Sequence, residues 1–135
     1  MRIPIEHARE VPTVTLRKDY IDICRDNIAA ALLLDFFETH IPDGELVPFT
    51  AKMLYDGILG LIGKKSIQDG LQTLEQLECI SIHDNPNPRY KCDKTKHFRI
   101  YREAIQIPLN MLTIGKSGKY TRYEGLDKAN ETYNN

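Results

Sequence analysis

The chain has 135 residues, 41% of them hydrophobic and 27% charged, and a formal net charge of −1. This composition is ordinary for a soluble globular protein, and the length suggests one domain that can bury its own core. No apolar run is long enough to cross a bilayer, the first ten residues lack the apolar core of a signal peptide, and three irregularly placed cysteines do not form a disulfide framework. We therefore expect a cytoplasmic protein that does not enter the membrane.

Charge is distributed unevenly along the chain. Residues 1–62 hold six basic and ten acidic residues, whereas residues 63–135 hold twelve and nine. Six of the basic residues fall within residues 86–102, which contain one acid, Asp93. Such a run is usually a solvated loop. The chain as a whole is not basic, so contact with nucleic acid would have to depend on a local basic surface of this kind.

The first half of the chain predicts an arm and a long helix. Residues 1–18 contain two prolines and predict an N-terminal arm. Residues 19–40 predict one helix, which is apolar nearly all round at residues 29–34. Such a helix is covered on more than one side, so it is either the central core helix or also part of a homodimer interface. The Ile-Pro-Asp-Gly segment at 41–44 ends it.

A short strand and a second helix follow. Residues 45–47 predict the strand that closes a small sheet. Residues 50–61 predict a helix with Thr50 as its N-cap, and several glycines near its end place a turn at 61–65.

Residues 63–82 predict a helix followed at once by a strand. In the helix, predicted over 66–78 with Ser66 as N-cap, apolar residues at 67, 71, 74 and 77 share one face. The period then changes to strand alternation at residue 79, and residues 79–84 and 97–102 predict a β-hairpin. The opposite helical face is polar and consists of Lys65, Gln68, Asp69, Gln72 and Gln76.

The order helix, strand, helix, turn, helix, strand, loop, strand predicts an α+β fold with a three-helix core and a small antiparallel hairpin, a winged helix-turn-helix. The loop 85–97 is the predicted wing. An apolar segment, interrupted by Pro108, ends the domain predicted over 19–112, and residues 113–135 predict a loose polar tail.

Two segments resemble known winged-helix proteins. The segment GKKSIQDGLQTLEQLECISI resembles the recognition-helix signature of these proteins, and DKTKHFRIYREAI at 93–105 resembles the wing-return strand of phage and plasmid replication initiators and DnaD-like proteins. The resemblance covers about residues 20–105. Those proteins usually place glycine where Glu78 stands, because the residue after the helix takes a left-handed conformation there. Glu78 therefore predicts either a different helix end or strain of about 1 kcal/mol.

The resemblance implies binding to double-stranded DNA, in a replication-initiation or transcription-regulator role. A helix fits the major groove, where glutamine amides can pair with adenine edges, and lysines at a helix start favour phosphate. Asp69 would repel phosphate but could accept from a cytosine amino group. The candidate DNA-binding residues are Lys64, Lys65, Ser66, Gln68, Asp69, Gln72 and Gln76 on the helix, and Arg89, Lys91, Lys94 and Lys96 on the wing.

Other functions have weaker support in the sequence. Cys79, His83, Cys92 and His97 flank the hairpin, but their spacing fits no common zinc module, so no metal or other cofactor is predicted. No glycine-rich phosphate loop connects a strand to a helix, and Cys24 falls on a core stripe, so no enzyme is predicted. The open alternative is a winged helix that binds a replication or regulatory protein instead of DNA, and the glutamines would then be a solvated face.

Overall fold

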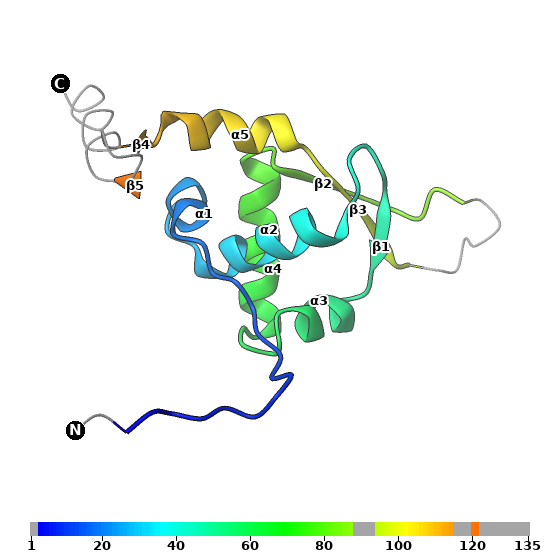
Figure 1. The fold of residues 1–135 in the computed structure, drawn as a ribbon. Coiled ribbons are helices and arrows are strands. Elements are labelled where there is room, and N and C mark those ends of the chain that lie inside the picture. The colour runs from blue at the N-terminus through cyan, green and yellow to red at the C-terminus, as the bar shows by residue number, and fades with distance from the viewer. Residues whose placement is uncertain (1–2, 88–93, 115–119, 122–135) are drawn as a thin grey trace.

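The computed structural model describes residues 3–87, 94–114 and 120–121, and in this part of the chain the predicted α+β class is confirmed (Figure 1). The helix of residues 28–40 lies at the centre, other helices pack around it, and a three-stranded antiparallel sheet covers one side. The elements are α1 (Lys18–Ile23), α2 (Ile28–His40), β1 (Val47–Phe49), α3 (Ala51–Gly57), α4 (Lys64–Gln76), β2 (Ile80–His83), β3 (Lys96–Ile100), α5 (Arg102–Met111), β4 (Thr113–Ile114) and β5 (Tyr120–Thr121).

The single helix predicted over 19–40 is wrong, because the chain breaks between α1 and α2. Arg25 and Asp26 both have positive φ angles, 58° and 62°, which a continuous helix does not allow. The Asn27 side chain then caps α2 by accepting a hydrogen bond from the Ala30 N–H at 3.0 Å. The apolar period continues across the break, so the hydrophobic pattern alone did not reveal it.

Helix α2 forms the core of the domain. Residues 29–34 and Phe37 are buried within this one chain. Phe37 stacks on Phe98 of β3 with ring centroids 5.1 Å apart, and Phe49 of β1 lies against both rings. The apolar surface around residues 29–34 that suggested a dimer interface is therefore covered by the chain itself.

The predicted hairpin is confirmed in pairing and differs slightly in length. Strand β3 is central, with β1 and β2 on either side, and all neighbours are antiparallel. Ile80 pairs with Ile100 and Ile82 with Phe98, and these residues turn toward the core. The predicted closing strand exists, but it lies at 47–49 rather than 45–47. Pro48 is tolerated there because β1 is an edge strand.

Helix α3 is shorter than the predicted 50–61. Its start is as predicted: the Thr50 hydroxyl accepts from the Met53 N–H at 3.1 Å. It ends at Gly57, and Leu59 and Gly60 then take positive φ angles of 57° and 64°. The turn therefore comes at 58–63, earlier than the predicted 61–65.

Helix α4 starts two residues before the predicted 66. Gly63 is its N-cap and the Gly63 carbonyl accepts from the Ile67 N–H at 3.0 Å, so the prediction of Ser66 as the cap is wrong. The residue that follows the end of the helix, Glu78, takes a left-handed conformation with φ 61°, as the resemblance implied. The Cys79 N–H reaches the Leu74 carbonyl at 3.0 Å, which closes a Schellman motif.

The last described helix, α5, begins beside the C-terminal end of α2 and packs against α1. The Arg102 guanidinium donates to the backbone carbonyl of Ile41 at 2.8 Å and to that of Glu38 at 3.3 Å. These are carbonyls that the end of a helix leaves unpaired. Of the predicted tail, only β4 and β5 are described, and they pair with each other. In the described ranges, no helix is both long and apolar enough to span a membrane.

Candidate nucleic-acid interface

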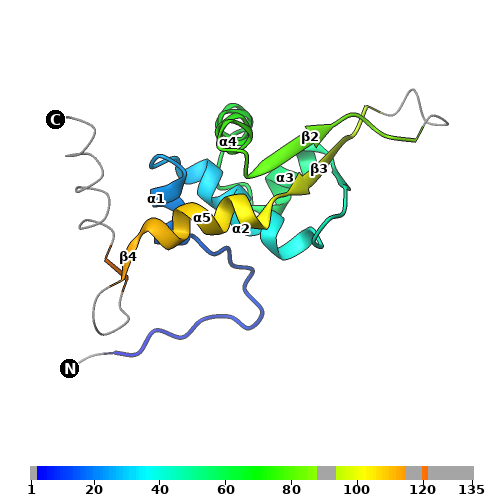
Figure 2. The same cartoon turned by 90° about the horizontal axis from the view of Figure 1, so that it is seen from above.

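The packing of α4 on α2 determines which face of α4 is free. Ile67 and Leu74 are buried, and Leu71, which was also predicted to be buried, is only half-buried. Seen down the axis of α4, the β2–β3 hairpin projects from beside this helix (Figure 2). As predicted, the polar side chains are exposed: Lys65, Gln68, Asp69, Gln72 and Gln76, together with Lys64 and Ser66 at the start of the helix.

Gly70 sets the closeness of the α2–α4 contact, a role that the hydrophobic pattern did not predict. A Cβ at this position would lie 2.9 Å from the Ala30 nitrogen and 3.1 Å from the Ala29 carbonyl carbon. The two backbones can approach this closely only because residue 70 has no side chain. On the same interface, the Asn27 amide donates to the Thr73 hydroxyl at 3.2 Å. A signal was present in the sequence, since a glycine in mid-helix costs about 1 kcal/mol and calls for a packing reason.

Two of the four predicted wing residues are described. Lys94 is exposed and Lys96 is exposed at the start of β3. The Lys96 ammonium forms an ion pair with the Asp84 carboxylate where the β2–β3 hairpin opens into the loop, and this lysine lowers the pKa of Asp84. The predicted contacts by Arg89 and Lys91 lie outside the described residues. Lys94 is thus the described wing lysine most open to phosphate, while Lys96 is partly neutralised.

The rest of the basic run does not face solvent freely. Arg102 is held by the end of α2, as described above. Arg99 is half-buried, and its Nε is buried with no hydrogen-bond partner among the described atoms. Counting charges along 86–102 therefore overstated the basic surface, because sequence position does not reveal which cations serve the fold.

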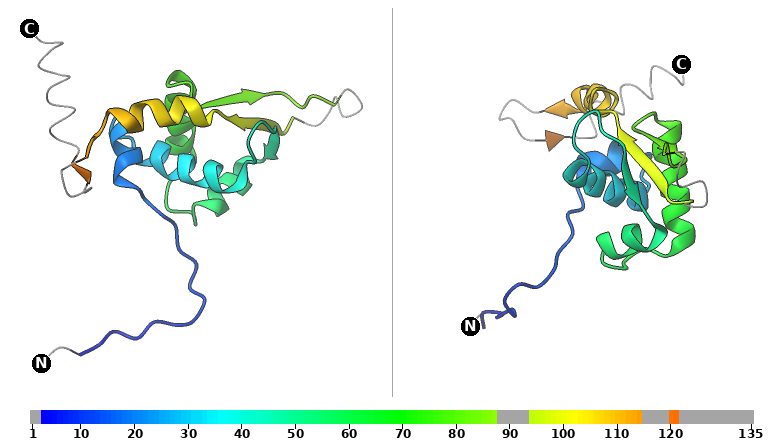
Figure 3. Two further views of the ribbon diagram at one scale, coloured as in Figure 1. Left: turned by 45° about the horizontal axis from the view of Figure 1, so that its top comes forward. Right: turned by 90° about the vertical axis from the view of Figure 1, so that its right-hand side faces the viewer.

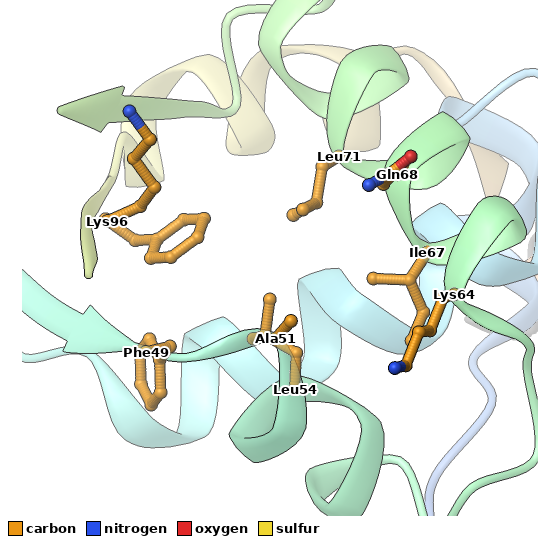
Figure 4. A pocket seen from close by; sticks show the side chains of 9 residues that line it. Phe49, Ala51, Leu54, Lys64, Ile67, Gln68, Leu71 and Lys96 are labelled. Atoms are coloured by element: carbon orange, nitrogen blue, oxygen red, sulfur yellow. The ribbon is translucent and has the colours of Figure 1, made fainter. Parts of the chain in front are cut away.

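A cavity of about 240 Å³ lies where α3, α4 and the sheet meet (Figure 4). Its floor is apolar, and polar side chains from two separate elements stand around it: Lys64 and Gln68 from α4, and Lys96 from β3. The apolar lining consists of Phe49, Ala51, Leu54, Ile67, Leu71 and Phe98. The fold thus brings the start of the predicted recognition helix and the base of the predicted wing to one place.

The other end of α4 is acidic. A second cavity, of about 440 Å³, is lined by Glu75 and Glu78 at the end of α4 and by Glu103 of α5. Positive side chains at 64 and 65 therefore stand at one end of the exposed face and carboxylates at the other. A phosphate backbone would be attracted to the first turn of the helix and repelled by Asp69 and by the carboxylates at its end.

The outer face of the hairpin carries a short hydrogen-bonded chain. The Ser81 hydroxyl lies 2.7 Å from His83 Nε2 and 2.9 Å from the Tyr101 hydroxyl. Cys79 is buried, and burial raises the pKa of its thiol to about 11, as expected for an inert packing residue. In the part of the chain that the structure describes, no three His, Cys, Asp or Glu side chains gather to hold a metal; Cys92 lies outside it.

Comparison of the chain with protein-family models, with curated proteins and with solved structures found no match.

Proposed function

We propose that this chain is a DNA-binding protein of the winged-helix type, in which α4 enters the major groove and the loop between β2 and β3 contacts the backbone. One observation carries the proposal: α4 exposes a row of glutamines, and its basic first turn lies around one cavity with the start of β3, next to the loop that carries the exposed Lys94. A helix and an adjacent hairpin arranged in this way can contact base edges and flanking phosphates together. A role in replication initiation or transcription regulation follows from the resemblance noted in the sequence.

The charge along α4 indicates how the DNA would lie. The carboxylates at its C-terminal end keep phosphate away, so the bases are read by the N-terminal and middle turns of the helix, up to Gln72. Gln68 and Gln72 would pair with base edges, while Lys64 and Lys65 at the positive end of the helix dipole would hold the adjacent backbone. Gln76, next to Glu75, contributes least.

The test is fluorescence anisotropy on a panel of duplexes across a salt series. Losing Lys94 should weaken binding to all sequences alike and reduce the salt slope by about one unit. Losing Gln72 should cost roughly 1–3 kcal/mol at the preferred site and little elsewhere. Gln106→Ala is the matched control, because this glutamine is exposed on α5, away from α4. A Gln72→Ala protein with unchanged sequence preference would exclude α4 as the reading element.

A protein-binding module is the second candidate. Asp69 in the middle of the exposed face, the Asp84–Lys96 pair and the apolar cavity all favour a protein ligand over phosphate. The same assay separates the two candidates: a wild-type chain that binds no duplex and no single strand at low salt is not a DNA-binding protein.

A further inference from the structure

Strand β2 lies at the edge of the sheet and has a free side. The described strands follow the order β1-β3-β2, so β3 pairs with only one side of β2. The Tyr101 N–H donates to the Cys79 carbonyl at 2.9 Å, and by alternation residues 79, 81 and 83 direct their main-chain groups toward β3. The N–H and C=O groups of Ile80 and Ile82 therefore point away from β3. No turn, cap or loop hydrogen bond among the described residues occupies them.

This edge lacks the usual protection against pairing with another chain. Exposed edge strands are commonly blocked by proline or lysine. The opposite edge strand, β1, contains Pro48, whereas β2 has the sequence Ile-Ser-Ile-His. Along β2 the exposure increases from the buried Ile80 to the exposed His83. An extended segment can therefore be added beside β2 through main-chain hydrogen bonds.

The cavity of about 440 Å³ at the end of α4 adjoins this edge. Ile80 and Ser81 of β2 line it, together with the exposed Tyr101 that follows β3. The end of α4 and the start of α5 meet here, at the end of the hairpin away from its loop (Figures 1 and 3). A strand added to β2 would thus pass beside the cavity.

The charge of this cavity is not compensated within the described part of the chain. The lining contains the carboxylates of Glu75, Glu78 and Glu103 and no basic side chain, and none of the three forms an ion pair there. Arg99 lies opposite Ser81 in the sheet but does not line the cavity. The negative end of the α4 dipole adds to the same field. The cavity therefore favours a positively charged ligand and repels phosphate.

We propose that β2 accepts an extended basic segment of a partner protein as an added antiparallel strand, with an arginine or lysine side chain of that segment in the acidic cavity. Only a polypeptide can use both the main-chain groups of the edge and the carboxylates beside it. The proposal does not rest on DNA binding, because this surface lies at the other end of α4 from Lys64 and Lys65.

Other segments of the same chain fit this surface less well. A second copy that paired through its own β2 would bring two sets of carboxylates together. The N-terminal arm carries Glu6 and Glu10 as well as arginines, so it is not basic. The basic part of the C-terminal tail contains β5, which already pairs with β4. The charge of the cavity thus selects a basic segment from another protein.

The experiment is fluorescence anisotropy with the full chain and a labelled nine-residue peptide in which arginine and threonine alternate. The peptide should bind, more weakly as salt is raised, and a peptide with glutamate in place of arginine should not. Replacing both Glu75→Gln and Glu103→Gln should raise the dissociation constant at least about tenfold, and both positions are exposed, so the fold is retained. Glu45→Gln is the matched control, because this exposed carboxylate precedes β1 at the opposite edge of the sheet.

Glu78→Gly separates loss of affinity from loss of fold. Glycine suits the left-handed backbone at this position, so the variant should fold at least as stably as the wild type. It should nevertheless bind the peptide more weakly, because one carboxylate of the cavity is removed. A Glu78→Gly protein and a double glutamine variant that both bind the peptide as tightly as the wild type would overturn the proposal.

Backbone methylation of the peptide tests the pairing with β2. In an antiparallel addition, the peptide residues opposite Ile80 and Ile82 point toward the core side and direct their N–H groups at β2, whereas the arginines point to the outer face. N-methylation of the threonines should therefore abolish binding, and N-methylation of the arginines should leave it unchanged. Equal effects of the two methylations would overturn the proposal, as would an arginine amide that binds as tightly as the peptide. Light scattering that shows a dimer dissociated by the peptide would identify a second copy as the occupant and overturn it too.

Discussion

Replacing Gly70 with alanine sets two physical effects against each other. Helix propensity alone favours alanine by roughly 1 kcal/mol at an interior position. The contact with α2 opposes it, because the added Cβ would lie 2.9 Å from the Ala30 nitrogen and 3.1 Å from the Ala29 carbonyl carbon. These are backbone atoms of a buried helix, so they cannot rotate away, and α4 must move as a whole. Overpacking of this kind costs typically 1–3 kcal/mol.

We expect the contact to outweigh the propensity and Gly70→Ala to destabilise the chain by roughly 1–2 kcal/mol. Equilibrium unfolding in urea measures this difference from the shift in midpoint at unchanged slope. Gln72→Ala, on the exposed face of the same helix, is the control and should change stability by less than about 0.5 kcal/mol. A Gly70→Ala protein more stable than the wild type would show that α4 does not lie this close to α2.

Three further perturbations follow from the packing. Leu74→Ala should cost roughly 2–5 kcal/mol of stability because Leu74 is fully buried, and Leu71→Ala should cost clearly less because Leu71 lines an open cavity. Glu78→Gly should stabilise the chain by about 1 kcal/mol, since Glu78 is left-handed; a lower melting temperature would contradict this. Burial raises the pKa of Cys24 to about 12 and that of Cys79 to about 11, from an ordinary value of 9.0. The folded state therefore favours the neutral thiols. Their contribution to the free energy of unfolding is full below about pH 9 and is lost as pH rises toward 11. The urea midpoint should therefore be lower at pH 10.5 than at pH 8.

Local periodicity predicted the elements best where one face of an element is buried. The change of period at Cys79 placed the hairpin, because alternation at Ile80 and Ile82 matches a strand with one side against the core. Thr50 was predicted correctly as a cap because its hydroxyl accepts from an N–H only three residues further along the chain. These features depend on interactions between near neighbours in the chain.

Features that depend on distant contacts were not predicted. The break at Arg25 and Asp26 leaves the apolar stripe continuous, so only the backbone reveals it. The role of Gly70 depends on how closely α2 passes, forty residues earlier in the chain. In the same way, Arg102 belongs to the basic run by its position in the sequence. In the structure, however, its guanidinium binds the end of α2.

Pairing, rather than the number of charges, decides which surface of this domain can meet an anion. Of the described cations near the hairpin, Lys96 shares its charge with Asp84 and Arg102 is occupied by backbone carbonyls, which leaves Lys94 and the first turn of α4. Exposed charges separated by more than about 10 Å are largely screened at ordinary salt concentration, so the carboxylates at the far end of α4 do not cancel that first turn. These carboxylates repel phosphate only near themselves, so they limit how far along α4 a phosphate backbone can bind. A DNA-binding role for this domain therefore requires a short contact centred on the N-terminal half of α4, completed by the loop between β2 and β3.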